Sequence, residues 1–374
     1  MPEHNSHSVQ DFSYPSGMYF IARFFYNHPR LALKINNWES WCLRNKIAEK
    51  SLDRPIYISG LVRAGTTILI EMLSNHPAIA NHRYLHMVNP YLPHWIQKVA
   101  NMTFLFKNPV HRLHKDRILV TRESPEAVEE VFWQFFFDGV HDNGKSNILD
   151  SDIHHIAFED FYKGHIKKLL VNQRASRYAT KNNYNISRLE YLLSLFPDAK
   201  FLLIVRNPLS HVASLMKQDR LFYEMEREDQ RLLHWTKLIG HREFGSAKTV
   251  INLDDPQTVK EIRSLWAKEE TAAKGWALYW AKVYDYLFRL LQQNKRLAES
   301  SLIIRYEDLC ENSSETLDQM VAHLEISADK FRPIKDAYID SLEQPSYYDP
   351  SFSDQDLRAI KEVTLEVARK YGYF

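Results

Sequence analysis

The fold is decided by the stretch IYISGLVRAGTT, residues 56–67. Ile56 to Ser59 form a short run of β-prone residues, and a glycine-containing loop follows from Gly60 to Gly65. Thr66 to Asn75 then carries apolar residues at helical spacing, and His76-Pro77 ends that helix. A strand, a glycine loop and a helix in this order predict an anion site, because loop amides and the helix N-terminus both attract negative charge.

The loop differs from those that bind nucleoside triphosphates. The Walker pattern G-x-x-x-x-G-K-[ST] needs a lysine after the second glycine, and Thr66 stands in that place. Arg63, inside the loop, supplies a cation instead. The sequence therefore disfavours a nucleoside triphosphate with Mg²⁺ and favours a mononucleotide-sized ligand with an anionic 5′ group.

Two later segments repeat the order of strand and helix. Lys200 to Val205 is an apolar run typical of a strand buried on both faces, and Asn207 is suited to cap the next helix. The third candidate strand is Ser301 to Tyr306. This alternation predicts an α/β fold with a P-loop-like core, in which helices flank a central, mostly parallel sheet of four or five strands. Ligands of such sheets bind beyond the carboxyl ends of the strands, where we place the glycine loop, the residues after Val205, and Lys181.

No linker, internal repeat or low-complexity tract divides the chain. We expect a helical N-terminal lead-in over residues 1–53 and one α/β domain over residues 54–374. Between the strands, Ser124 to Trp133 predicts a helix that Ser124 caps, and Trp266 to Leu291 predicts one long helix. The aromatic residues in these two segments are expected in the core.

The composition excludes several classes of protein. The 374 residues include 48 basic and 47 acidic ones, which disfavours a nucleic-acid partner. Cys42 and Cys310 form no CxxC pair, and the closely spaced histidines lack obvious carboxylate partners, so we expect no metal. The N-terminus has no secretory pattern, and no apolar run reaches the ~20 residues of a membrane span. These features predict a cytoplasmic protein without a transmembrane segment.

Taken together and in this order, the motifs resemble the sulfotransferases that use 3′-phosphoadenosine 5′-phosphosulfate (PAPS). In that family the 5′ loop often reads R-[SG]-G-T-T after a strand ending in Ser-Gly, and residues 58–67 are similar to it. The family also places an arginine at a strand end and a serine eight positions later, as Arg206 and Ser214 stand here. RYEDL, residues 305–309, resembles a later strand-to-helix junction of the family. The resemblance covers about residues 54–330.

This resemblance implies transfer of a sulfuryl group from PAPS to an acceptor hydroxyl on a glycan, a lipid or another small alcohol, with no metal. It implies that Arg206 and Ser214 bind the 3′-phosphate. Arg63 and Lys181 would neutralise charge on the sulfuryl oxygens. The residues implied to bind the 5′-phosphate are those of the loop: Arg63, Ala64, Gly65, Thr66 and Thr67.

Sulfuryl transfer also needs a base for the acceptor proton, and histidine titrates in the suitable range. We rank His82 first, because it lies near the place where the tyrosylprotein branch keeps its catalytic glutamate. His114 is second, and His86 and Glu123 are further candidates.

The sequence departs from the family pattern in some places. Ala64 replaces a common serine, Asn207 replaces a common aspartate, and the C-terminal basic, glycine-rich loop of the soluble small-molecule branch is not found. Two alternatives stay open. One is a P-loop kinase of a small substrate, which the missing lysine disfavours, and the other is a nucleotide-binding scaffold without transfer activity.

Overall fold

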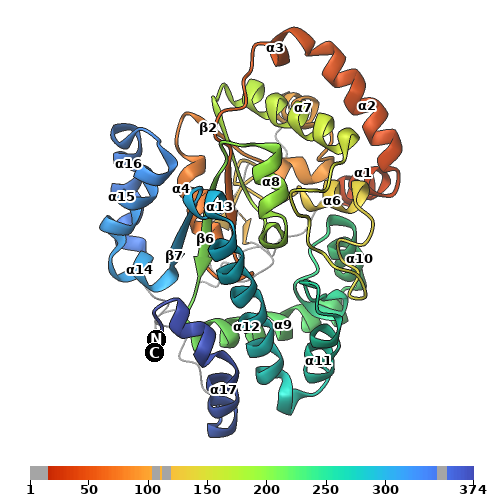
Figure 1. The fold of residues 1–374 in the computed structure, drawn as a ribbon. Helices are drawn as coiled ribbons and strands as arrows, with labels where there is room; N and C mark the ends of the chain where they lie inside the picture. Colours follow the sequence, from red (N-terminus) through yellow and green to blue (C-terminus); the bar gives the residue numbers. More distant parts are fainter. Residues whose placement is uncertain (1–15, 103–109, 112–118, 343–351) are drawn as a thin grey trace, which may run out of the picture.

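The central sheet has five strands in the order β2-β5-β1-β6-β7, and every pairing is parallel (Figure 1). The computed structural model describes residues 16–102, 110–111, 119–342 and 352–374. The strands are β1 (Ile56–Ser59), β2 (Ile79–Ala80), β5 (Arg177–Lys181), β6 (Lys200–Val205) and β7 (Ser301–Arg305). The α/β class with a mostly parallel sheet is therefore confirmed.

Helices cover both faces of the sheet and enclose two cores. Side chains along β1 alternate between them: Tyr57 lies in the larger core, and Ile56 and Ile58 lie in the smaller one. Around the smaller core lie α4 (Thr66–Ser74), α14 (Tyr306–Glu311), α15 (Ser313–Leu324) and α16 (Ala328–Tyr338). The larger core includes side chains of α7 (Ile156–Gln173), α8 (Leu189–Leu195), α9 (Pro208–Glu228) and α12 (Glu269–Gln293).

The N-terminal segment is helical where the structure describes it. It forms α1 (Ser16–Asn27), α2 (Pro29–Cys42) and α3 (Arg44–Ala48). The boundary at residues 53 and 54 stays a prediction. The remaining described elements are α5 (Pro93–Met102), α6 (Glu130–Phe136), α10 (Gln230–Ile239), α11 (Pro256–Trp266), α13 (Lys295–Glu299), α17 (Asp354–Lys370), the 3-10 helices η1 (Tyr84–Val88), η2 (Asn183–Ser187), η3 (Gly245–Ala247) and η4 (Ile339–Ser341), and the ribbon of β3 (Val110–His111) and β4 (Leu119–Val120).

Two predicted helices differ from the structure. The helix expected from Ser124 begins only at Glu130, because the preceding backbone is extended and Pro125 forms a β-bridge with Arg83. The Ser124 hydroxyl accepts the N–H of Thr121 instead of capping a helix. The long helix expected over Trp266 to Leu291 is present as α12, but it begins three residues later, at Glu269, because α11 ends at Trp266.

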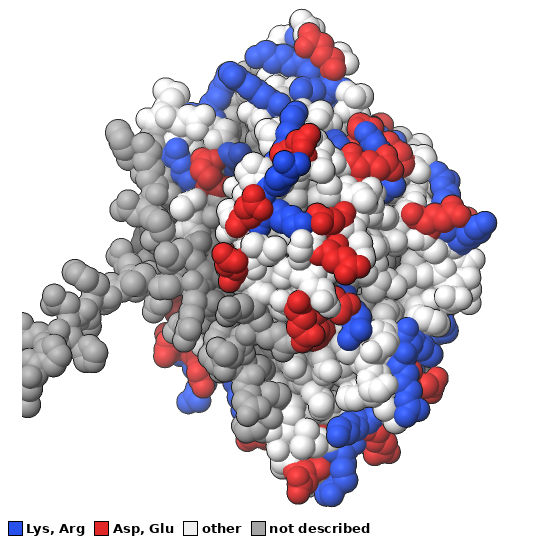
Figure 2. All heavy atoms as spheres, turned by 90° about the vertical axis from the view of Figure 1, so that its left-hand side faces the viewer, with Lys and Arg blue, Asp and Glu red and all other residues white. Residues whose placement is uncertain are grey.

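Charges are mixed on the face that carries α14, α15 and α16, as Figure 2 shows. Several of them form ion pairs there, such as Lys335 with Asp318 and Arg332 with Asp329. In the part of the chain that the structure describes, no helix is both long and apolar enough to cross a membrane.

Candidate active site

The glycine loop between β1 and α4 needs glycine at two positions, Gly60 and Gly65, because of its backbone conformation and the atoms close to it. Gly60 has φ +154° and Gly65 has φ +105°, both outside the range that L side chains favour. A Cβ at Gly60 would lie 2.5 Å from the Ile204 carbonyl oxygen, and one at Gly65 would lie 2.5 Å from the Tyr306 ring. Arg63 also has positive φ, +72°, a conformation that costs roughly 1–3 kcal/mol and is found mostly at functional sites. Gly65 precedes the first turn of α4, and no side chain of the N-cap accepts a hydrogen bond from the amides there.

Three of the predicted donor-site residues lie together beside this loop. The Arg63 Nε–H donates to the Ser214 hydroxyl over 3.3 Å, and Arg206 Nη1 donates to the Arg63 carbonyl over 3.1 Å. Arg206 follows β6 directly, and Asn207 caps α9 by accepting the N–H of Leu209. Ser214 therefore lies in the second turn of α9 and reaches back to the loop. The eight-residue spacing therefore brings both Arg206 and Ser214 into contact with Arg63 of the loop.

The guanidinium of Arg206 is almost fully buried, with 7% of the residue exposed. Its Cζ lies 4.6 Å from the centre of the Tyr306 ring. Among the described residues, its Nε–H has no hydrogen-bond partner. A buried cationic donor without a partner is costly, so this side chain fits an anionic ligand such as a phosphate. The predicted junction at residues 305–309 supports it, because Glu307 accepts the N–H of Asn207 over 3.0 Å.

His211 also holds the loop, a role that the sequence did not reveal. Its Nε2 lies 2.8 Å from the Val62 carbonyl oxygen, to which it must donate a hydrogen. Burial, with the nearby charges of Arg206 and Arg63, lowers the pKa of His211 to about 3. The ring is therefore neutral. Its only sequence signal is a place four residues after the helix cap.

A pocket opens next to the loop, at the carboxyl end of β5. Thr67, in the first turn of α4 directly after the loop, lines the pocket. Lys181 is the last residue of β5 and pairs with Ile58 of β1, so the parallel register brings it to the start of the glycine loop. The pocket is lined by Thr67, Ile70, Asn81, His82, Pro125, Glu126, Ala127, Ala179, Thr180 and Lys181.

His82 lines this pocket but is buried, with 2% exposed. Its Nε2 lies 3.2 Å from Nε2 of His165, and the two rings stack. Burial lowers the pKa of His82 to about 3. A base works best with a pKa near the operating pH, so this environment counts against the predicted role of His82. The nearby His86 is buried as well, and its Nδ1 accepts the N–H of Arg83.

Of the other predicted bases, Glu123 is not among the residues that line the pocket. His114 lies outside the described residues. Glu123 is largely exposed and forms ion pairs with Arg83 and Arg122.

Glu126 is the pocket carboxylate that the sequence analysis missed. It is partly buried, and its Oε1 accepts the N–H of Ala127 over 2.7 Å. Its own N–H donates to the His82 carbonyl over 3.0 Å, which ties this extended segment to the opposite wall. No local motif marks Glu126, because it reaches the pocket only through the bridge between Arg83 and Pro125.

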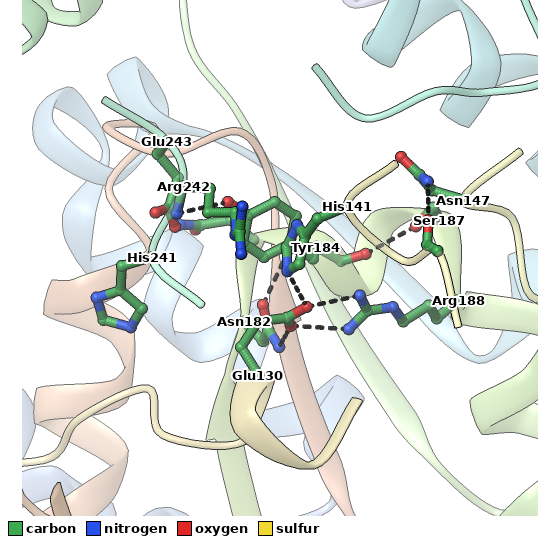
Figure 3. A network of polar contacts seen from close by, with 12 residues as sticks. Glu130, His141, Asn147, Asn182, Tyr184, Ser187, Arg188, His241, Arg242 and Glu243 are labelled. Carbon is green, nitrogen blue, oxygen red and sulfur yellow. Dashed lines mark hydrogen bonds and ion pairs between the residues drawn. The ribbon is translucent and has the colours of Figure 1, made fainter. Parts of the chain in front are cut away.

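Asn182, the residue after Lys181 in the chain, belongs to a buried network of polar contacts (Figure 3). The Asn182 amide donates to Glu130 Oε2 over 2.8 Å, and its Oδ1 accepts the N–H of Tyr184. Arg188 binds both oxygens of Glu130, each over 2.8 Å. Burial alone would favour the neutral acid, but the Arg188 charge holds the pKa of Glu130 well below its usual range. This ionised pair therefore anchors the residue that follows Lys181.

The chain is similar to known sulfotransferases in sequence and in fold. A sequence profile described as the sulfotransferase family matches residues 55–244, slightly more than half of the chain. That segment contains every predicted site residue. No curated protein sequence matches at the significance that we applied.

Among solved structures, the chain is similar to sulfotransferase STF9 from Mycobacterium avium, with a TM-score of 0.51 and 12% identity over 95% of this chain and 82% of that one. It is also similar to sulfotransferase STF1 from Mycobacterium tuberculosis H37Rv, with a TM-score of 0.48 and 15% identity over 92% of this chain and 85% of that one. At such identity the first likeness shows the fold alone.

Proposed function

This chain belongs to the sulfotransferase family, and on that premise we propose that it transfers a sulfuryl group from PAPS to a hydroxyl group of an acceptor. The observation that carries the proposal is the cluster of Arg63, Ser214 and Arg206 beside the glycine loop. It joins two cationic side chains to a loop that binds anions without the lysine of the nucleoside-triphosphate enzymes.

The donor is assigned to this cluster and the loop. Amides at the start of α4, from Gly65 to Thr67, would bind the 5′-phosphate with the help of the helix dipole. Arg206 and Ser214 would bind the 3′-phosphate. The buried Nε–H of Arg206 supports this assignment, because a phosphate oxygen would supply the acceptor that it lacks among the described residues.

The pocket beside Thr67 is assigned to the acceptor. When bound, PAPS supplies an activated sulfuryl group: the acceptor oxygen forms a bond to sulfur, the bond between sulfur and the bridging oxygen breaks, and adenosine 3′,5′-bisphosphate leaves. Lys181 and Arg63 would offset the negative charge of the sulfuryl and bridging oxygens. The network of Asn182 and Glu130 would hold Lys181 in place for this task.

Glu126 is the preferred base in this proposal. Its carboxylate lines the same pocket as Lys181, and it is only partly buried. The acceptor proton would pass to a Glu126 oxygen as the bond to sulfur forms. His82 remains the alternative, but it would have to take a proton in a place where burial keeps it neutral.

The test begins with ligand binding. Adenosine 3′,5′-bisphosphate at about 100 times its Kd should stabilise the protein by about 2.7 kcal/mol without Mg²⁺. Stronger stabilisation by ATP with Mg²⁺ would favour the kinase alternative. Turnover is then measured by mass spectrometry with labelled PAPS and a panel of hydroxyl acceptors. Tight binding of the bisphosphate with no labelled product from any acceptor would favour the inactive scaffold.

A further inference from the structure

The outer side of α1 and α2 exposes large apolar side chains. We call it the α1–α2 face. Of the twelve large hydrophobic residues that are exposed in the described part of the chain, it holds six: Phe20, Ile21, Phe24, Leu31, Trp38 and Trp41. The two tryptophans are each 61% exposed. An exposed apolar patch of this kind is typical of a surface that binds another protein or a membrane.

The face is organised around α2. Leu31, Lys34, Trp38 and Trp41 follow one stripe of that helix at helical spacing. The other side of α2 is anchored in the protein, since buried Glu39 accepts a hydrogen bond from Lys168 over 2.8 Å. The Trp38 ring stands edge-on against Trp95 of α5, 5.1 Å away. α5 extends the apolar surface with two more exposed residues, Val99 and Met102.

The exposed charge of α1, α2 and α3 has one sign only, and the next acidic residue is Glu49, directly after α3. The exposed charged residues between positions 16 and 48 are all basic: Arg23, Arg30, Lys34, Arg44 and Lys46. The only acidic residue in that range is Glu39, which is buried in its pair with Lys168. The Arg44 guanidinium lies 4.8 Å from the Trp41 ring, so basic and aromatic groups share one surface. The face with α14 to α16 differs, because acidic and basic residues alternate there (Figure 2).

We propose that the α1–α2 face binds the surface of an anionic lipid bilayer. Helices with aromatic residues on one side and Lys or Arg around them lie in the plane of the interface, and tryptophan settles at the level of the headgroups. The basic residues would meet anionic headgroups, each worth about a fivefold gain in partitioning. This proposal does not depend on the proposed function.

Charge argues against a second copy of the chain as the occupant. Two copies that met through this face around a twofold axis would place the same residues opposite each other. Their exposed charges would then all be positive, since no exposed acidic residue lies between positions 16 and 48 to pair with them. An anionic bilayer satisfies both the apolar and the basic side chains of the face.

The buried side of α1 contacts a segment that adjoins the candidate pocket. Tyr26 of α1 donates its hydroxyl hydrogen to the Met87 carbonyl in η1, over 3.1 Å. η1 begins two residues after His82, which lines the pocket. α1 is therefore joined to the proposed acceptor site through η1.

The test is flotation of the full chain with vesicles. Vesicles of phosphatidylcholine with about one third phosphatidylserine should bind the protein, and vesicles of phosphatidylcholine alone should bind it weakly. Arg30→Glu with Lys34→Glu should lower partitioning at least about 25-fold, at about fivefold for each positive charge removed. Trp38→Ser with Trp41→Ser should lower it too, by removing the apolar part.

Lys330→Glu with Arg332→Glu on α16 is the matched control, because it changes the net charge equally at two exposed residues. It should leave partitioning nearly unchanged. An equal loss in this control, or equal binding to both kinds of vesicle, would overturn the proposal. So would a dimer in light scattering that Trp38→Ser with Trp41→Ser dissolves, since the face would then be a protein interface. Circular dichroism melting of each variant separates lost binding from lost folding.

Discussion

The donor half and the acceptor half of the candidate site are built in different ways. The donor half comes from one loop, one strand end and the first turns of two helices, α4 and α9, and its cluster of Arg63, Ser214 and Arg206 is closed by direct hydrogen bonds. The acceptor half is a pocket whose walls come from four separate segments of the chain. Its ionisable groups also differ, because it holds the carboxylate of Glu126 together with Lys181, whereas the donor cluster has two arginines. Each part of the proposed anion site is therefore marked within one short stretch of the sequence, although the fold joins the parts, whereas the residues of the proposed proton transfer carry no such local mark.

The largest expected effect concerns the acceptor half. Glu126→Gln should lower kcat by about 10²–10⁴, because the amide cannot accept the acceptor proton, while the Kd of adenosine 3′,5′-bisphosphate stays near that of the wild type. Steady-state kinetics and calorimetry measure the two quantities. Glu123→Gln is the matched control, since Glu123 is close in sequence but lies outside the pocket lining. His82→Gln decides between the candidates: a loss of kcat there, with Glu126→Gln unaffected, would return the role of base to His82.

Lys181 is expected to have the next largest effect. Removing one group that stabilises developing charge lowers kcat by about 10²–10³, so Lys181→Ala should do so with a smaller change in the Kd of the bisphosphate. Lys295→Ala is the control, because Lys295 is exposed on α13, which precedes β7 and so lies away from the carboxyl ends of the strands. If Lys181→Ala weakens binding of the bisphosphate as much as it lowers kcat, Lys181 belongs to the donor half.

The difference between the two halves explains what the sequence could predict. β1, β6 and the glycine loop are marked by apolar runs and by glycines over a few residues, and the structure has these elements where they are expected. β5 is harder to recognise, because Arg177 and Lys181 bound it and hide the apolar pattern. Arg177 is nevertheless buried, since its guanidinium donates to the Arg54 carbonyl over 2.6 Å.

Glu126 shows why some residues of the acceptor half could not be predicted from the sequence. Its segment follows the pattern of a helix start, Ser-Pro-Glu-Ala, and helix propensity alone predicts a helix there. The backbone is instead drawn out by the bridge to Arg83 and by the hydrogen bond to the His82 carbonyl. Such pairing between distant residues overrides local propensity. The burial of His82 against His165 likewise cannot be predicted from one segment of the sequence, because the two residues lie far apart in the chain.

In the donor half, Arg206→Ala should weaken binding of adenosine 3′,5′-bisphosphate by roughly 1.5–3 kcal/mol, which is the value of a charge-assisted hydrogen bond. Binding of 5′-AMP, which lacks the 3′-phosphate, should change little. Calorimetry with both ligands gives the comparison, and Arg220→Ala is the control on the exposed side of α9. Equal losses for the two ligands would mean that Arg206 supports the loop through the Arg63 carbonyl and does not bind the 3′-phosphate.

The smallest expected effect, taken per pH unit, is the dependence of stability on pH. Burial lowers the pKa of both His82 and His211 to about 3, whereas an unfolded histidine has a pKa of about 6.5. The unfolded state therefore binds protons first as the pH falls. The stability is complete above about pH 6.5, and each histidine lowers the free energy of unfolding by about 1.4 kcal/mol per pH unit between about pH 6.5 and pH 3. His82 has buried histidine neighbours, His86 and His165, whose pKa values are also lowered by burial, so more of this sensitivity lies in the acceptor half.

Urea unfolding at several pH values measures this dependence of stability on pH: His82→Gln should be less stable than the wild type at pH 7.5 but should lose about 1.4 kcal/mol less per pH unit on acidification. Parallel curves for the two proteins would mean that His82 is protonated as readily in the folded chain as in the unfolded one, and would restore it as a base that titrates in the ordinary range.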